Sequence, residues 1–226
     1  MSWRDMPEAI PDEQIAEVID ADIAVVGLGF AGTAAFRAAA EAGAKVVALE
    51  SQAEDKYSVW GRDIGHINSK FLKSRGIPEV DPIVFYNEWM HRAANRANPE
   101  LAMTFARKSG ENFDWFTDMI DDMSAVRVAF WDDKIDNAFK REALKGDFEL
   151  NGFHYWYGTA QFPGMFGDHR FPSLKDICRL NHKKAEDLGG EVRFGVSAVQ
   201  LVQEDGRVTA VIGQDSQGQY IRENAA

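Results

Sequence analysis

The fold is decided by residues 22–50, which read DIAVVGLGFAGTAAFRAAAEAGAKVVALE. The apolar run at 23–26 stops at Gly27 and predicts a buried parallel strand. The alanine-rich segment 33–42 predicts a helix, because alanine is the strongest helix former. The apolar run at 45–49 predicts a second strand. Together these segments predict a complete βαβ unit in about 30 residues.

The spacing of the glycines after the first strand predicts a dinucleotide-binding turn. Gly27 allows the tight turn out of the strand, and Gly29 leaves room for a pyrophosphate to approach the backbone. Gly32 lets the helix pack close to the strand. The first helical turn, with Phe30 and Ala31, would then present its N–H groups and the positive end of its dipole to the phosphates.

Glu50 stands at the end of the second predicted strand, 18 residues after Gly32, close to the roughly 20 residues typical of such units. A carboxylate at this place accepts hydrogen bonds from both hydroxyls of a ribose, and it disfavours the 2′-phosphate of NADP. On the residues alone, FAD and NAD both stay open as the cofactor. A glycine-rich turn with a purely structural Glu50 stays open as well.

The composition excludes several other classes of protein. Of 226 residues, 25 are Lys or Arg and 36 are Asp or Glu, so the formal net charge is −11, which argues against a nucleic-acid partner. No run of ~18 apolar residues exists, so we expect no membrane-spanning helix. The single cysteine, Cys178, excludes an internal disulfide and a multi-cysteine metal site. Residues 1–20 lack the apolar core of a signal peptide, so we expect a cytoplasmic protein without a metal.

The rest of the chain predicts elements around this unit. Residues 1–21 are interpreted as a leader with a helix that starts near Pro11 and carries Ile15, Val18 and Ile19 on one face. Residues 81–124 predict a layer of three helices, over 81–96, from Pro99 onward and over 111–123, with aromatic stripes facing the core. A helix and strands then return to the sheet within 173–226. The helix is predicted over 173–187, with a capping box at Ser173 and Asp176 and with Cys178 buried as an inert thiol. Strands are predicted at 191–194, 198–202 and 208–212, and a further strand starts at Tyr220.

The loop after the second predicted strand would face a bound cofactor, because ligands lie beyond the carboxyl ends of parallel strands. Asp63 and Asn68 either bind ribityl hydroxyls or make local turn hydrogen bonds. For Arg62 and His66 we expect solvent-facing roles rather than contact with a flavin. The aromatic and glycine-rich segment 152–172 predicts a long loop that packs against the helices, or alternatively forms the wall of a pocket.

Residues 22–50 resemble the N-terminal ADP-binding unit of FAD-dependent oxidoreductases, and the chain is similar to the fumarate reductase and succinate dehydrogenase flavoprotein family. Further likeness lies in 81–123, which includes GENFDWFTDMI, in 173–190, and in the strand pair at 197–208. The resemblance implies an α/β fold: a Rossmann-like FAD-binding domain with a parallel sheet, helices and a β-hairpin or meander near the C-terminus. It also implies that relatives continue beyond Ala226, so we expect an incomplete N-terminal fragment without the substrate-capping domain.

The resemblance further implies a cofactor and a reaction. FAD would contact the glycine turn and Glu50, and also Ser51, Asn68 and the backbone of Ala198, which matches the place where relatives contact the adenine ring. The complete protein would be an FAD-dependent oxidoreductase that reduces or forms a C=C bond next to a carboxylate or carbonyl of a small-molecule substrate. The family's proton donor lies downstream, so no catalytic residue is named, the electron donor stays open and we expect this chain alone to be inactive. The alternatives are an NAD-dependent Rossmann oxidoreductase and a non-catalytic nucleotide-binding module.

Overall fold

The computed structural model describes residues 8–61, 63–129, 149–150, 153–162, 164 and 172–225. They divide into two compact units, one made of Met1–Val59 with Cys178–Ala226 and the other of Trp60–Ile177. The predictions for Arg62 and for much of segment 152–172 lie outside the described residues.

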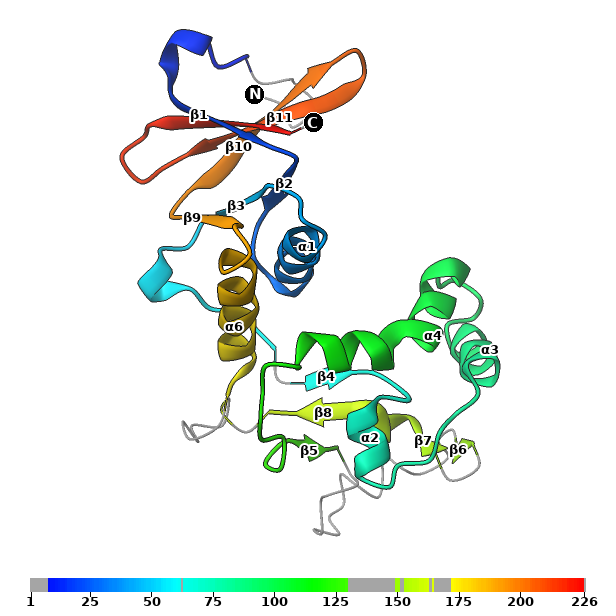
Figure 1. The fold of residues 1–226 in the computed structure, drawn as a ribbon. Helices are drawn as coiled ribbons and strands as arrows, with labels where there is room; N and C mark the ends of the chain where they lie inside the picture. Colours follow the sequence, from blue (N-terminus) through cyan, green and yellow to red (C-terminus); the bar gives the residue numbers. More distant parts are fainter. Residues whose placement is uncertain are drawn as a thin grey trace. The chain divides into compact units, whose positions relative to one another are not determined.

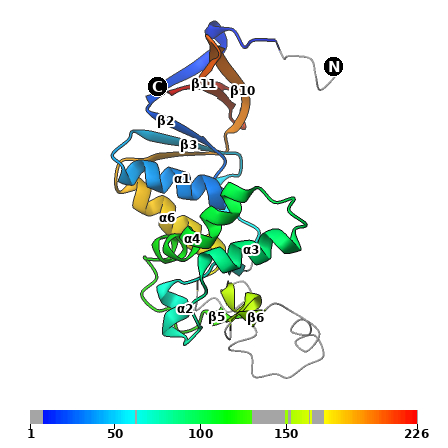
Figure 2. The same cartoon turned by 90° about the vertical axis from the view of Figure 1, so that its right-hand side faces the viewer.

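A parallel sheet forms the centre of the first unit. Its strand order is β2-β3-β9, and α1 connects the first two strands across one face of the sheet (Figures 1 and 2). The bounds are β2 Ile23–Val26, α1 Phe30–Glu41, β3 Val46–Glu50, α6 Leu174–Glu186 and β9 Glu191–Phe194. The register pairs Ile23 with Val46 and Val47 with Glu191. This arrangement confirms the βαβ unit, the helix after Ser173 and the strand at 191–194.

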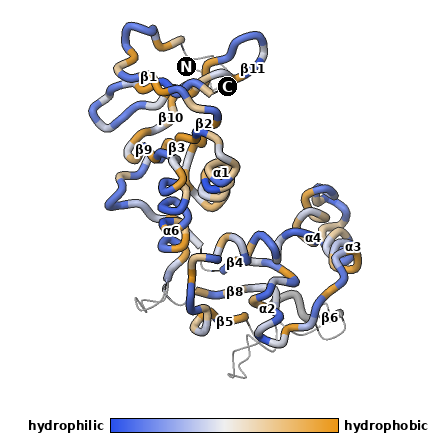
Figure 3. The backbone as a smooth tube through the Cα atoms, in the orientation of Figure 1, coloured by the Kyte–Doolittle hydropathy of each residue, from blue (hydrophilic) through white to orange (hydrophobic). Residues whose placement is uncertain are grey.

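A second sheet of four strands belongs to the same unit. Its order is β1-β12-β11-β10, with β1 Ile15–Ala21, β10 Ser197–Glu204, β11 Arg207–Gln214 and β12 Tyr220–Ala225. The hairpin and the third strand confirm the predicted meander. Figure 3 shows its hydrophilic turns, including Glu204 to Arg207, which suit solvent-facing tips.

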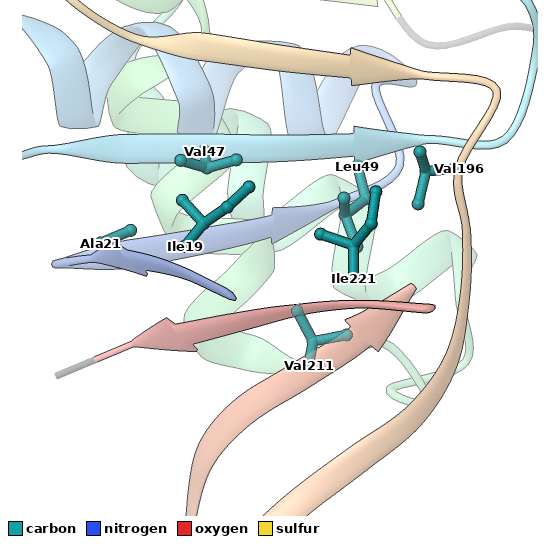
Figure 4. Close-up of a cluster of buried hydrophobic side chains, with 7 residues drawn as sticks. All are labelled: Ile19, Ala21, Val47, Leu49, Val196, Val211 and Ile221. Carbon is teal, nitrogen blue, oxygen red and sulfur yellow. The ribbon is translucent and has the colours of Figure 1, made fainter. Parts of the chain in front are cut away.

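The core of this unit lies where the two sheets meet. β1, β3, β11 and β12 all contribute apolar side chains to it (Figure 4). The members are Ile19, Ala21, Val47, Leu49, Val196, Val211 and Ile221. All five residues of β3 are buried: the apolar residues 46–49, as the sequence predicts, and the terminal Glu50. The prediction of a buried strand is wrong for much of β2, because Ile23 is 40% and Val26 55% exposed at an edge of the described sheet.

The helix expected at the N-terminus is a second correction. A short 3-10 helix, η1 (Asp12–Gln14), is followed directly by β1, which pairs in parallel with β12. Ile15, Val18 and Ile19 have helical spacing, but Ile19 and Ala21 also fit the two-residue period of a strand. Pairing with β12, some 200 residues away along the chain, decided between the two patterns. Ile19 and Ala21 are buried in the core while Val18 is 58% exposed.

Within the residues that the structure describes, the second unit combines the helices α2, α3 and α4 with small antiparallel sheets. The strand order β4-β8-β5 makes one sheet, and β6 and β7 make another. The bounds are β4 Asp63–Gly65, α2 Lys70–Ser74, α3 Pro82–Arg92, α4 Pro99–Phe116, β5 Arg127–Val128, β6 Glu149–Leu150, β7 Phe153–His154 and β8 Thr159–Gln161. Two further 3-10 turns are η2 Glu54–Lys56, in the first unit, and η3 Tyr155–Gly158.

The predicted helices from Pro99 and from Glu111 are one continuous helix, α4. Gly110 stays within it because the chain near Ile67 approaches closely: a Cβ at Gly110 would lie 2.2 Å from the Ile67 carbonyl oxygen. Ser109 accepts a hydrogen bond from the Ile67 N–H at 3.1 Å, and Asp114 accepts one from the Lys70 N–H at 2.9 Å. The helix therefore holds the segment before α2, which the sequence interpretation did not anticipate.

The expectation that the aromatic and apolar stripes of α3 and α4 are core is confirmed only in part. Met90, Ala106 and Phe113 are buried. Ile83 is 53% exposed and Leu101 is 69% exposed, so the first turns of α3 and α4 leave apolar side chains uncovered. Helical periodicity identified the helices but did not identify which turns are covered.

Candidate functional site

The turn between β2 and α1 has the backbone geometry expected of a phosphate-binding loop. Gly27 has a φ of +82°, which L side chains rarely adopt. Its N–H donates to the Leu49 carbonyl at 2.7 Å, which joins the turn to β3. Gly29 is the N-cap of α1 and brings no side chain to the helix terminus. A Cβ on Gly29 would meet nothing within 4 Å, so the amide end of the helix has open space before it.

Gly32 lies where the helix crosses the strand. A Cβ at this position would lie 1.8 Å from the Gly27 carbonyl oxygen, well inside any tolerable contact. The close helix–strand packing predicted from the motif is therefore present, and no side chain fits there.

The Leu28 peptide is held at both ends by side chains of the same unit. Its N–H donates to Glu50 Oε2 at 2.8 Å. Its carbonyl accepts from the Tyr57 hydroxyl at 2.6 Å and from the Thr33 hydroxyl at 3.0 Å. These bonds hold the loop in place without any ligand. Sequence reasoning missed Tyr57 and Thr33; Thr33 follows the last glycine of the motif, but nothing local marks Tyr57.

Glu50 is only 4% exposed and sits at the end of β3. Besides the Leu28 N–H, its carboxylate accepts from the Gln52 N–H at 2.8 Å and from the Ser51 hydroxyl at 3.4 Å. Two oxygens offer about four acceptor positions. Three of these positions are filled, so about one remains for a ribose hydroxyl. The bonds to the backbone fix where the carboxylate lies.

Uncharged groups lie behind the loop. The Nε2 atom of His182 lies 2.8 Å from the Thr33 hydroxyl oxygen. Because that hydroxyl donates its own hydrogen to the Leu28 carbonyl, it accepts from His182, so Nε2 carries the hydrogen. Burial lowers the pKa of His182 to about 4 and raises the pKa of Cys178 to about 11. Burial also raises the pKa of Tyr57. The prediction of a buried Cys178 thiol is confirmed.

Most of the predicted cofactor contacts lie together. Gly27, Gly29, Phe30, Ala31, Gly32, Glu50 and Ser51 surround the carboxyl ends of β2 and β3. Ala198 is an exposed residue near the start of β10, two residues after Val196, whose N–H donates to the Glu50 carbonyl at 3.0 Å. The geometry fits the roles given to the glycines and Glu50, while contact between these residues and FAD stays a prediction.

Asn68 and His66 belong to the second unit. The Asn68 side chain donates to the Val80 carbonyl at 2.8 Å and accepts from the Val80 N–H at 3.0 Å, so it binds backbone groups 12 residues away and not within its own turn. Contact between Asn68 and FAD stays a prediction. The expectation of a solvent-facing His66 is wrong. His66 is 1% exposed and stacks on Phe113 with ring centroids 3.7 Å apart, because α4 packs over the segment that follows β4. Burial lowers the pKa of His66 to about 4.

Comparisons with known proteins agree with this geometry. The family model described as FAD binding domain matches residues 22–226. This match favours FAD over NAD, the two cofactors that the glycine turn and Glu50 left open. No curated protein sequence matches the chain. Among the residues that the structure describes, no helix combines the length and apolar character needed to cross a membrane.

Three solved structures share the fold. A 3-ketosteroid-Δ4-(5α)-dehydrogenase from Rhodococcus jostii RHA1, in complex with 4-androstene-3,17-dione, is 22% identical with a TM-score of 0.65 and covers 95% of this chain and 46% of its own. A flavocytochrome c3 fumarate reductase is 17% identical with a TM-score of 0.63, and the match covers 93% of this chain and 33% of that protein. The E. coli quinol fumarate reductase is 12% identical with a TM-score of 0.58, and the match covers 92% of this chain and 32% of that protein. The chain thus spans a third to a half of the length of these proteins.

Proposed function

The chain belongs to the FAD binding domain family, and on that premise we propose that it holds the ADP half of FAD in an oxidoreductase that reduces or forms a C=C bond next to a carboxylate or carbonyl. The names of the structural neighbours support the reaction class. One is a fumarate reductase and another is bound to 4-androstene-3,17-dione. Both compounds carry a C=C bond beside a carboxylate or a ketone. The substrate would accordingly be a small unsaturated acid or ketone.

The residues present fit this cofactor. The open space at Gly29 and the uncapped N-terminus of α1 suit a pyrophosphate. Glu50, fixed by two backbone N–H groups, suits a ribose with free hydroxyls. When bound, FAD supplies the hydride transfer, and the protein supplies binding, orientation and electrostatics. Within this chain those contributions come from the glycine turn, from Glu50 and from the side chains that hold Leu28.

The observation that carries the proposal is the empty space before Gly29, and a substitution tests it. Gly29→Leu should fill that space and abolish retention of flavin, measured as the loss of the flavin absorbance band from the purified full-length protein. The matched control is Ala35→Leu, which places the same leucine side chain at an exposed position of α1. Full FAD occupancy in Gly29→Leu would contradict the proposal.

The reaction class needs a separate measurement. The full-length protein, reduced with dithionite-reduced methyl viologen, should be reoxidised by fumarate or by an α,β-unsaturated ketone, and not by succinate or the saturated ketone. Reoxidation by none of a panel of unsaturated acids and ketones, with FAD fully bound, would instead support a nucleotide-binding module without chemistry of its own.

A further inference from the structure

The peptide between Leu28 and Gly29 carries an N–H group at the surface of the glycine turn. Leu28 is buried, whereas Gly29 is exposed. The peptide is trans, so the Leu28 carbonyl and the Gly29 N–H point in opposite directions. The carbonyl is directed toward the buried hydroxyls of Tyr57 and Thr33. The Gly29 N–H therefore points away from the buried side, and it has no acceptor among the residues that the structure describes.

Two hydroxyls fix the plane of this peptide. A carbonyl oxygen has two acceptor positions, and the Leu28 oxygen uses both, for Tyr57 at 2.6 Å and for Thr33 at 3.0 Å. A rotation that turned the Gly29 N–H inward would break both hydrogen bonds and leave a buried carbonyl unsatisfied, which proteins rarely tolerate. The direction of the Gly29 N–H is thus set by two side chains and not by the glycine spacing alone.

The Tyr57 hydroxyl is held by the packing of its ring. The ring lies edge-on to His182 of α6 and to Phe194 of β9, with centroids 5.2 and 5.8 Å away. Burial raises the pKa of Tyr57, so the hydroxyl keeps its hydrogen at neutral pH and stays a donor. Tyr57, His182 and Phe194 all belong to the first unit, so the second unit is not needed for this arrangement.

The Thr33 hydroxyl is oriented by His182. Nε2 of His182 donates to the hydroxyl oxygen at 2.8 Å, which leaves the hydroxyl hydrogen for the Leu28 carbonyl. Thr33 and His182 are both buried. Both donors to Leu28 are therefore fixed before a ligand binds, and a ligand that uses the Gly29 N–H does not have to order it.

On the premise of the proposed function, we propose that Tyr57 and Thr33 are positioning residues for the pyrophosphate of FAD. By holding the Leu28 carbonyl, they direct the Gly29 N–H at a phosphate oxygen. Their own side chains, being buried, act through the peptide and do not touch the cofactor. The two hydroxyls accordingly determine how strongly the turn prefers a nucleotide with a diphosphate to the bare nucleoside.

ADP and adenosine test the proposal, because they share the adenine and the ribose and differ in the diphosphate. Calorimetric titration of the full-length protein after removal of FAD measures both affinities. Tyr57→Phe keeps the ring and removes the hydroxyl, so the affinity for ADP should fall about tenfold, the worth of one hydrogen bond to a charged group. The affinity for adenosine should change less than twofold. Equal losses for the two probes would show a merely structural role for Tyr57 and would overturn the proposal, as would an unchanged affinity for ADP.

The matched control is Tyr220→Phe, which removes a hydroxyl from a half-buried ring of the same unit at the start of β12. Both affinities should stay as in the parent protein. A loss of ADP affinity as large as that in Tyr57→Phe would contradict the assignment.

Variants of Thr33 test the second donor and do not depend on the folding of Tyr57→Phe. Thr33→Ser keeps the hydroxyl and should keep the affinity for ADP within about twofold. Thr33→Val has the shape of threonine without the donor and should bind ADP roughly tenfold more weakly, with adenosine little changed. Equal ADP affinities in the serine and valine variants would overturn the role of Thr33.

The FAD-loaded protein offers a spectroscopic readout. The ³¹P signals of bound FAD report on the surroundings of the pyrophosphate. Tyr57→Phe should shift these signals relative to the parent protein, and Tyr220→Phe should not. Unchanged ³¹P signals in both Tyr57→Phe and Thr33→Val would contradict the proposal.

These outcomes separate the inference from the proposed function. If the parent protein binds FAD and ADP, and the variants without a hydroxyl bind ADP as tightly as the parent, only the inference fails. If the parent protein binds neither FAD nor ADP, the proposed function fails and the inference falls with it.

Discussion

The glycine turn of the first unit and the aromatic cavity of the second unit, which lies between α3, α4 and the segments at β4 and β8, are built by different parts of the chain. The turn presents backbone N–H groups; its shape depends on the absence of a side chain at Gly32, and the space before it depends on the absence of one at Gly29. The cavity depends on the side chains of residues from α3, α4 and the segment at His66. A site made of backbone leaves a fixed spacing in the sequence, and a site made of side chains from distant segments does not. The same difference predicts how the two regions respond to substitution.

The largest effect is expected at Gly32. Gly32→Ala places a Cβ on the Gly27 carbonyl oxygen, which the strand and the helix cannot both avoid. We expect the free energy of unfolding to fall by at least about 3 kcal/mol, together with loss of FAD. Chemical denaturation and flavin absorbance measure the two effects.

The matched control for Gly32 is Gly29→Ala, where the added Cβ meets nothing within 4 Å. Its free energy of unfolding should stay within about 1 kcal/mol of the parent protein. Similar losses of stability at both positions would break the distinction between the packing glycine and the ligand-facing glycine.

The two units also contain buried groups with opposite responses to pH. The pKa of His66 lies at about 4, below the ordinary 6.5, so the unfolded chain takes up a proton first and stability is lost as the pH falls from 6.5 to 4. The pKa of Glu223 is raised by burial to about 7, so its contribution is full below pH 4.5 and is lost as the pH rises to 7. A tenfold difference in proton affinity between the folded and the unfolded chain corresponds to about 1.4 kcal/mol.

Urea unfolding of single variants measures both responses. His66→Phe should lose stability less steeply than the parent protein between pH 6.5 and 4, and Glu223→Gln should gain stability relative to the parent at pH 8 but not at pH 4. The controls are His91→Phe and Glu204→Gln at exposed positions. Parallel pH profiles for Glu223→Gln and the parent would show that Glu223 ionises normally in the folded protein.

A smaller effect is expected at Glu50. Glu50→Gln keeps the shape of the side chain but replaces one acceptor oxygen by a donor, which would face the N–H of Leu28 or Gln52. We expect a loss of about 2 kcal/mol in the free energy of unfolding and at least roughly tenfold weaker binding of FAD, by calorimetry. Glu54→Gln, at an exposed position of η2, is the control. Unchanged FAD affinity in Glu50→Gln would remove Glu50 from the site.

The smallest effect is expected in the second unit, at Ser109. Ser109→Ala removes the acceptor for the Ile67 N–H and should cost about 1 kcal/mol. Chemical denaturation measures this loss, and flavin absorbance should stay constant because Ser109 and Ile67 both belong to the second unit. Loss of flavin from this variant would show that the two regions are not independent.

The sequence predicted the first region far better than the second. The glycine turn, Glu50, α6 with its Ser173 cap, and the strands from Glu191 onward follow from local patterns that carry their own geometry. The N-terminal strand was predicted as a helix, because its apolar residues fit both periods and only pairing with β12 distinguishes them. α4 was predicted as two helices, because nothing local shows that Gly110 is needed by a neighbouring segment.

By itself, the sequence determined the βαβ unit, its dinucleotide-binding turn and the acid at the end of β3. Those features depend on which residues follow one another along the chain, and the spacing of the glycines predicts the backbone geometry of the turn directly. Only the tertiary structure decided that Tyr57 and Thr33 hold Leu28, that Asn68 binds the Val80 backbone, and that His66 is buried beside an aromatic cavity. Apart from the bond between Thr33 and Leu28, these contacts join residues at least 12 positions apart in the chain. The free energy that selects them comes from packing, which a local sequence pattern does not predict.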